Sequence, residues 1–368
     1  TRSIVKECIQ LLVKVIPDIE DISLFIKLVI NTLEREDSNF VQELKTLRRV
    51  LVLSIIYEYC QYSNHTFEEH LKCFDKILLD SIQSAVHIVK TLGYKAVGVV
   101  CCLNCPQMAT KYYNILMPVA MLESGHVLPE ILSSLIDMVL SYGIQVFEDE
   151  DVHQSKRFFD FLVDQLHSQD GSMKVIAVKG VFKLLISRGI KPWVLTHVLI
   201  SGFTSYFDSD SALFVDVPNF FKRYIYTRDG PRVVGQIVWP TMKIVLDSPS
   251  SSILRKVGVD HVGMILLSIL QERKELPELQ VQFALDMCHY LEGNSLYIVD
   301  LLSILCHVFY DPTYTDEIIY LHVKCLEFLQ ESLDSQEKRL LKKWEKVLRN
   351  SLMESNAGAR YLNKDETL

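Results

Sequence analysis

Cysteine is the residue type whose spacing in this chain comes closest to a chemical site. Cys101, Cys102 and Cys105 lie within five positions, and the last two form a Cys-x-x-Cys pair of the kind that binds zinc or cycles between dithiol and disulfide. A zinc site needs four ligands, and no second Cys-x-x-Cys or His-x-x-x-His follows in the chain. Cys101 and Cys102 also end an apolar helical run, so we expect core thiols at the end of a helix.

Acidic residues could hold a metal ion by themselves. The run Glu148, Asp149, Glu150 and Asp151 carries four carboxylates, but it lacks the interleaved glycine and terminal glutamate of a calcium-binding loop. We expect a solvated loop. The sequence also contains no GxGxxG, GxxxxGKS/T, GxSxG or HExxH pattern. It therefore predicts no metal site, no cofactor and no enzymatic activity; the catalytic alternative is a hydrolase assembled from dispersed cysteines and histidines.

Basic residues offer a different chemistry, contact with the phosphates of a nucleic acid. Lys179 and Lys183 lie four residues apart and so share one face of a helix, and Arg188 and Lys191 follow closely. For Lys179, Lys183 and Arg188, phosphate contact and a solvated helix face are both open alternatives.

Two further basic groups occur later in the chain. Lys222 and Arg223 stand beside Phe220, Phe221 and Tyr224, and basic residues among aromatics can bind nucleic acid, although aromatics more often fill a core. Basic residues also decorate an amphipathic helix predicted at 338–349, which we expect to be the last helix and to cap the fold. The candidate DNA contacts are Lys179, Lys183, Arg188, Lys191, Lys222 and Arg223.

The overall charge limits how such contacts could work. The 368 residues include 38 Lys or Arg against 46 Asp or Glu, for a net charge of −8, so any DNA contact must use a local patch. Nine cysteines, scattered through apolar segments, are typical of free thiols in a reducing compartment. No apolar run approaches the roughly 18 residues of a membrane span, and no leader opens the chain. We expect a soluble intracellular protein and, because it starts at Thr1, a segment of a longer polypeptide.

The spacing of apolar residues predicts that the cysteine, acidic and basic candidates are carried by helices and by the short loops between them. Apolar positions recur at spacings of three and four almost everywhere, as in Leu44, Leu47, Leu51 and Ile55. Glycine (14) and proline (11) are scarce and fall mainly at short polar breaks. The sequence predicts an all-α fold, with no β segment.

Three of these helical segments align with one another. Residues 88–104, 127–143 and 172–189 share apolar and small positions, with Leu92, Ile131 and Ala177 in register. A period of about 40 to 47 residues is that of HEAT or armadillo repeats, in which helix pairs stack and bury one another's apolar faces. Lys90 and Lys174, near the starts of two copies, are expected to form structural ion pairs with a neighbouring repeat.

The repeat sets the expected domain organisation. Residues 1–350 accommodate roughly eight helix pairs in one α-α superhelix, a HEAT-repeat solenoid, and residues 351–368 are expected to be a loose polar tail. The alternative is two separate helical bundles linked by residues 147–156, although ten polar residues would serve equally well as a loop between repeats.

Several ordered segments resemble the C-terminal HEAT-repeat region of the condensin subunit 3 (chromosome-associated protein G) family. They include LKTLRRVLVLSIIYEYCQ at 44–61, ILLDSIQSAVHIVKTLGYKAVGVVCCLN at 77–104, DFLVDQLHSQDGSMKVIAVKGVFKLLISRGI at 160–190, FFKRYIYTRDG at 220–230 and VWPTMKIVLDSPSSS at 238–252. Their order and spacing are similar over more than 200 residues. The chain departs from the family at Lys90 and Lys174, where arginine is usual, and at Val99, Val100 and Cys101, which replace a helix end containing glycine.

The resemblance implies a non-catalytic subunit that holds a segment of the kleisin subunit and binds double-stranded DNA together with it. ATP hydrolysis would belong to the SMC subunits of the holocomplex. It further implies a role in mitotic chromosome condensation, a nuclear and chromosomal location with a cytoplasmic pool, and no membrane contact. Solenoids of this period also serve as scaffolds and as nuclear transport receptors, which is the alternative function.

Overall fold

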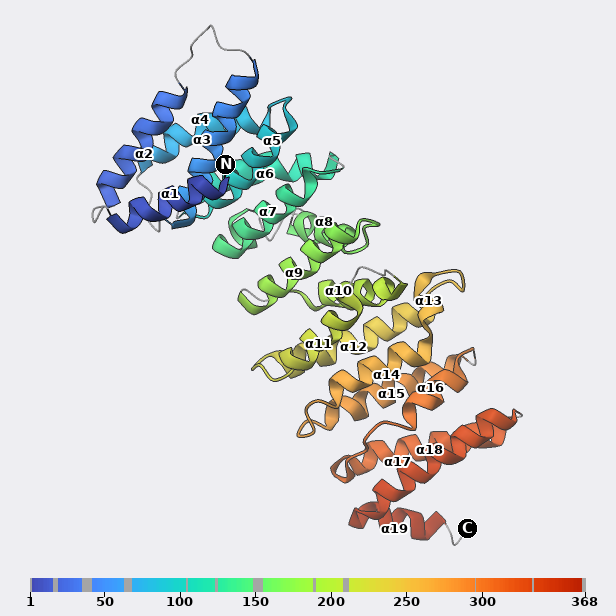
Figure 1. Cartoon of the computed structure of the whole chain (residues 1–368). Coiled ribbons are helices and arrows are strands. Elements are labelled where there is room, and N and C mark those ends of the chain that lie inside the picture. Colours follow the sequence, from blue (N-terminus) through green and yellow to red (C-terminus); the bar gives the residue numbers. More distant parts are fainter. Residues whose placement is uncertain are drawn as a thin grey trace. The chain divides into compact units, whose positions relative to one another are not determined.

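The computed structural model describes residues 2–15, 19–34, 42–62, 68–103, 105–122, 125–147, 155–187, 190–207, 212–294, 296–332 and 334–365. Within these ranges all regular elements are helices and none is a strand, which confirms the all-α prediction. The chain divides into two compact units, Thr1–Ile190 and Lys191–Leu368, coloured blue to green and green to red in Figure 1. No helix in the described ranges has the length and apolarity needed to cross a membrane.

The first unit is a stack of helix pairs. Helices α3, α5, α7 and α9 pack against one another in succession and form a row, and each also packs against the helix that precedes it in the chain. Helix α1 adds a further contact to α3. The bounds are α1 Arg2–Val15, α2 Ile19–Glu34, α3 Gln42–Tyr62, α4 Glu68–Ile82, α5 His87–Cys101, α6 Pro106–Leu122, α7 Leu128–Tyr142, the 3-10 turn η1 Ile144–Val146, α8 Ser155–Leu166 and α9 Gly171–Ser187.

The three aligned sequence segments correspond to α5, α7 and α9, which are consecutive members of this row. Small residues let these helices approach closely. A Cβ atom on Gly98 of α5 would overlap Ser134 of α7, and one on Gly180 of α9 would overlap Ile136 of α7. The Ser134 hydroxyl also donates to the carbonyl oxygen of Tyr94 at 2.9 Å. The repeat in the sequence therefore marks the helices that carry the stacking contacts.

The second unit contains two rows of helices. Helices α10, α12, α15 and α17 pack in succession in one row, and α11, α14, α16 and α18 in the other. With the first unit, this gives eight helix pairs in the described part of the chain, the number predicted. The bounds are α10 Pro192–Thr204, η2 Ser205–Phe207, α11 Leu213–Tyr224, α12 Gly230–Asp247, α13 Ile253–Val257, α14 Val259–Leu270, α15 Glu278–Gly293, α16 Ile298–Leu305, η3 Pro312–Tyr314, α17 Thr315–Glu331, α18 Ser335–Met353 and α19 Asn356–Asp365.

Buried polar contacts connect the last helices of this unit. The Trp344 indole N–H on α18 donates to the Tyr310 hydroxyl at 2.8 Å, and that hydroxyl donates to the carbonyl oxygen of Leu305 at 3.1 Å. The Ser351 hydroxyl donates to the Tyr310 carbonyl oxygen at 2.6 Å. Since buried polar groups are stable only when paired, these bonds fix the register of α18 on the segment that follows α16.

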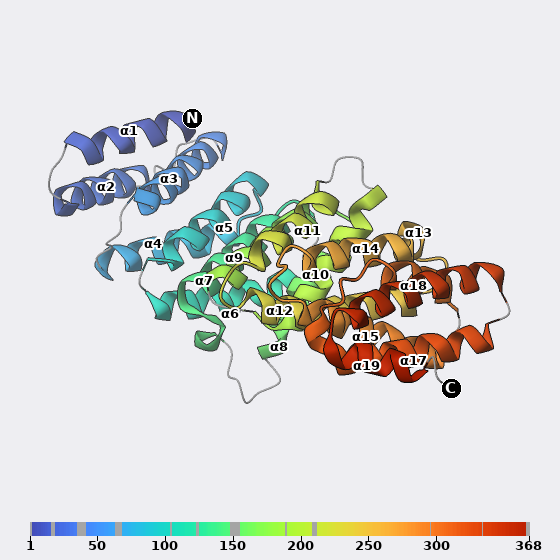
Figure 2. The same cartoon turned by 90° about the horizontal axis from the view of Figure 1, so that it is seen from below.

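The prediction of a loose tail after residue 350 is wrong for most of that segment. Helix α18 continues to Met353, and α19 follows and packs against α17 and α18, as Figures 1 and 2 show. Leu362 is only 2% exposed, and the Tyr361 hydroxyl lies 3.2 Å from Nδ1 of the buried His322. Of the apolar residues in this polar sequence, Leu352 and Leu362 are buried, a pattern too short to give a periodic signal. Helix α18 is accordingly not the terminal cap that we expected.

Candidate nucleic-acid interface

The cysteine cluster is part of the helix packing. Cys101 is the last residue of α5 and is fully buried, as expected for a core thiol at a helix end. Burial raises the pKa of the Cys101 thiol well above its usual value and also raises the pKa of Cys102. Both thiols are therefore protonated near neutral pH, unlike the thiolates that bind metals or attack disulfides. In the described ranges no group of three His, Cys, Asp or Glu side chains is arranged to hold a metal ion.

Two of the candidate DNA contacts lie together on α9. Lys179 and Lys183 are both exposed and lie one turn apart. Burial raises the pKa of the Asp137 carboxyl on α7, and the positive charge of Lys183 opposes that rise. Lys179 and Lys183 are thus accessible to a phosphate, with one carboxylate nearby.

The other sequence predictions for the first unit have different outcomes. Lys174 is 9% exposed, which leaves it unsuited to DNA, and its expected ion pair with a neighbouring repeat stays a prediction. Lys90 is half-buried. Arg188 and the acidic run at 148–151 lie outside the described residues.

The remaining candidates belong to the second unit. Gly202 of α10 lies against Val217 of α11, and the rings of Tyr206 and Phe214 are 4.7 Å apart, so the two helices run antiparallel. Lys191, just before α10, therefore lies toward the same end of this pair as Lys222 and Arg223, near the end of α11.

These three side chains are not equally available for phosphate contact. Lys191 and Arg223 are exposed. Lys222 is half-buried, and its ammonium lies 3.5 Å from Oε1 of Glu272, so its charge is already partly neutralised. The sequence could not show this ion pair because Glu272 follows α14, fifty residues further on.

The aromatic residues beside this basic group belong to the core. Phe221 and Tyr224 are buried, and the half-buried Phe220 ring stacks on Tyr224 at 5.8 Å. They are consequently not positioned to stack on nucleic-acid bases, and the alternative interpretation that they fill the core is the one the structure supports.

Sequence reasoning missed an exposed aromatic cluster in the second unit. We define the aromatic cluster as Tyr206, Phe207, Phe214 and His261. Tyr206 contacts the rings of the other three at centroid distances of 4.9, 4.7 and 6.0 Å, and Phe214 and His261 stack at 5.9 Å. Tyr206 is 48% exposed and Phe207 55%. Large exposed aromatic groups mark interaction surfaces in soluble proteins.

The cluster joins η2, the start of α11 and the start of α14. On the same two helices Val215 and Met264 are also exposed, so an apolar surface extends beyond the rings. Asp216 and Asp260, both exposed, add negative charge at its edge. This arrangement suits an extended apolar peptide segment better than a nucleic acid, because the carboxylates of Asp216 and Asp260 beside it would repel phosphates.

Stacked helix pairs, with small residues at their contacts and protonated buried thiols, define a helical-repeat protein. A family model, described as Cnd3, nuclear condensing complex subunits, C-terminal domain, matches residues 52–310. Because the match covers more than half of the chain, the chain belongs to this family, as the resemblance in the sequence predicted.

Two relatives show how far the likeness extends. Human condensin complex subunit 3 is 20% identical over 222 residues, which cover 53% of this chain and 22% of the human protein. The crystal structure of the S. pombe condensin Cnd3–Cnd2 subcomplex matches with a TM-score of 0.76 and 15% identity, over 95% of this chain and 48% of that chain. The second match supports the HEAT-repeat solenoid fold. The chain spans less than half the length of either relative.

Proposed function

We propose that this chain is part of a non-catalytic, regulatory condensin subunit that binds a kleisin subunit and contributes to DNA binding. The observation that carries the proposal is the family match over residues 52–310. It favours a condensin subunit over the nuclear transport receptor or phosphatase-type scaffold that the repeat period alone would also allow.

The kleisin part of the proposal has two supports. The S. pombe relative was crystallised as a subcomplex with Cnd2, which we take to be the kleisin-type partner. The aromatic cluster offers exposed apolar side chains on which an extended segment can pack, and aromatic residues contribute most to the binding free energy of many interfaces. We assign the kleisin contact to this cluster.

The DNA part rests on exposed basic side chains. Lys179 and Lys183 in the first unit, and Lys191 and Arg223 in the second, are free to approach phosphates, with Arg188 as a further candidate and Lys222 as a weaker one. With a net charge of −8, the chain alone should bind duplex DNA weakly, so we assign DNA binding to the kleisin-bound protein. Contact with the SMC subunits would come through the holocomplex.

The same proposal gives the cellular setting. A subunit of this family would act in mitotic chromosome condensation, in the nucleus and on mitotic chromosomes, with a cytoplasmic pool. ATP hydrolysis would remain with the SMC subunits.

A pull-down tests the choice of partner. The tagged chain is mixed with overlapping segments of a kleisin subunit from the same organism and, separately, with Ran and with a basic nuclear import peptide. We expect stoichiometric retention of a kleisin segment alone. Retention of Ran or of the import peptide, with no kleisin retained, would reverse the proposal.

A further inference from the structure

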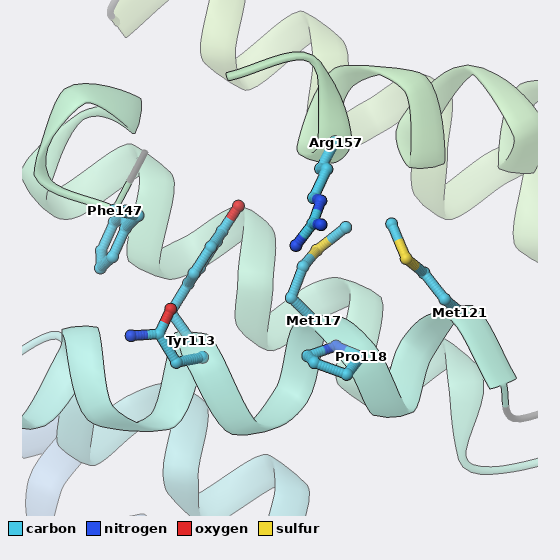
Figure 3. A pocket seen from close by; sticks show the side chains of 7 residues that line it. Tyr113, Met117, Pro118, Met121, Phe147 and Arg157 are labelled. Carbon is cyan, nitrogen blue, oxygen red and sulfur yellow. The ribbon is translucent and has the colours of Figure 1, made fainter. Parts of the chain in front are cut away.

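A small cavity lies between α6 and α8 in the first unit, and none of its lining residues is proposed above to bind kleisin or DNA. Its volume is about 280 Å³. Pockets for drug-sized ligands and cofactors usually occupy roughly 300–1,000 Å³, so this one suits a single large side chain better than a cofactor. Figure 3 shows its lining.

The walls of the cavity are apolar and adaptable. Tyr113, 2% exposed, stacks on Phe147 with ring centroids 4.6 Å apart and an interplanar angle of 18°. Met117 forms the buried floor, and Met121, one turn further along α6, is 50% exposed. Methionine side chains are flexible and polarisable, and they adapt well to aromatic and aliphatic groups.

One cation stands over this apolar floor. The Arg157 side chain reaches from α8 across Met117, with Tyr113 on one side and Met121 on the other (Figure 3). It is exposed, and it makes no hydrogen bond or ion pair within the described part of the chain. Its five N–H donors are therefore available to a ligand.

The cavity also offers an acceptor. Pro118 lies inside α6 and has no backbone N–H, so the carbonyl oxygen of Asn114, four residues earlier, lacks its usual helical donor. Asn114 and Pro118 both line the cavity. A phosphate would need several cationic groups, whereas a peptide can supply both a carboxylate for Arg157 and backbone polar groups for the side-chain amide of Asn114.

We propose that this cavity binds a short acidic peptide segment of a partner protein. One large apolar side chain of the peptide lies among Tyr113, Met117 and Met121, and a neighbouring carboxylate pairs with Arg157. The site lies in the first unit, whereas the aromatic cluster lies in the second, so it can be tested independently of kleisin binding.

Fluorescence anisotropy with the full chain tests the proposal. The probe is the fluorescein-labelled peptide Gly-Glu-Glu-Phe-Glu-Glu-Gly, and two matched peptides carry alanine in place of phenylalanine or lysine in place of glutamate. We expect the first peptide to bind at least about tenfold more tightly than either control. Arg157→Glu should weaken binding of the first peptide at least about tenfold and shift the preference toward the lysine peptide. Arg360→Glu makes the same change in net charge at an exposed residue of α19 and should leave the affinity unchanged.

Equal binding of all three peptides, or no detectable binding of the glutamate peptide, would overturn the proposal. So would an Arg157→Glu variant that melts like the wild type and binds the glutamate peptide with unchanged affinity. Should Arg157→Glu fail to fold, Met121→Ser provides a second test at an exposed position. The proposal requires that Met121→Ser weaken binding of the phenylalanine peptide but not of the alanine peptide.

Discussion

Tyr142 on α7 donates its phenolic hydrogen to the carbonyl oxygen of Cys101, the last residue of α5, at 2.7 Å. The same hydroxyl accepts the backbone N–H of Cys105 at 3.0 Å. Carbonyl groups at the end of a helix have no partner within the helix, and Tyr142 supplies one from the next helix of the row. The cysteine cluster is therefore held by a structural contact between neighbouring repeats.

Replacing Tyr142 with phenylalanine should destabilise the first unit. Tyr142→Phe leaves the Cys101 carbonyl and the Cys105 N–H without this partner, which we expect to lower the free energy of unfolding by about 1–3 kcal/mol. Urea denaturation measures the change. Tyr226→Phe is the comparison, because Tyr226 also donates to a backbone carbonyl but is largely exposed, so that water can replace its bond at smaller cost. Equal destabilisation of the two variants would contradict the structural role of Tyr142.

The same residue predicts a pH dependence. Burial raises the pKa of Tyr142 to about 12, against the opposing effect of the Cys105 hydrogen bond, whereas an unfolded tyrosine titrates near pH 10. The folded protein thus keeps a proton that the unfolded chain releases, so this contribution is complete below pH 10 and is lost as the pH rises to 12. Between these values the wild type should lose stability more steeply than Tyr142→Phe. If the free energy of unfolding fell equally steeply with pH in the wild type and in Tyr142→Phe, the prediction would be wrong.

The close approach of α7 and α9 depends on a glycine. Gly180→Val should lower the free energy of unfolding by about 1–3 kcal/mol, since even a Cβ atom there would overlap Ile136 and the two helices would have to separate. Gly171→Val in the same helix has open space around it and should change stability by about 0.5 kcal/mol or less. Thermal denaturation followed by circular dichroism compares them. A Gly180→Val variant as stable as Gly171→Val would show that this contact is not tight.

The terminal helix α19 should contribute to the second unit. Leu362→Ala removes a buried side chain, and we expect it to lower the free energy of unfolding by about 2–3 kcal/mol. Arg360→Ala, two residues earlier on the exposed side, is the matched control and should be nearly neutral. If both variants are as stable as the wild type, α19 is not packed against the second unit and the expectation of a loose tail regains support.

Charge reversal on α9 tests the DNA contacts. The triple variant Lys179→Glu, Lys183→Glu and Arg188→Glu should weaken duplex binding by the kleisin-bound protein and reduce the slope of log affinity against log salt, by about 0.9 for each phosphate that the variant no longer neutralises. The control is the pair Lys338→Glu and Lys342→Glu, which are exposed on α18 at the same four-residue spacing. A salt slope unchanged in the triple variant, or reduced as much in the control, would show that the α9 residues are only surface charge.

The sequence predicted the parts of this molecule that depend on short-range periodicity. Gly98 and Gly180 fall in the segments that align with each other, and these segments are the stacked helices α5, α7 and α9. The apolar helical run that Cys101 ends also predicted its thiol at a helix end. These features follow from spacing along one helix or from a regular offset between helices.

Contacts between distant helices were not predictable in the same way. Tyr206 meets His261, and Lys222 meets Glu272, because α11 packs beside α14 in the second unit. In a chain where nearly every helix is amphipathic, an exposed aromatic residue such as Phe207 has the same sequence pattern as a buried one such as Phe203. The cavity beside Pro118 was hidden for a related reason, since Arg157 reaches it from another helix.

Calorimetric titration of the kleisin segment into the chain tests the central claim most directly. We predict that the wild type binds, that Tyr206→Ala with Phe207→Ala weakens binding at least about tenfold, and that Ile186→Ala with Met353→Ala, which also removes two exposed apolar side chains, leaves it unchanged. Absence of heat with the wild type would contradict the proposed function, and equal affinity of all three proteins would contradict the assignment of the kleisin contact to the aromatic cluster.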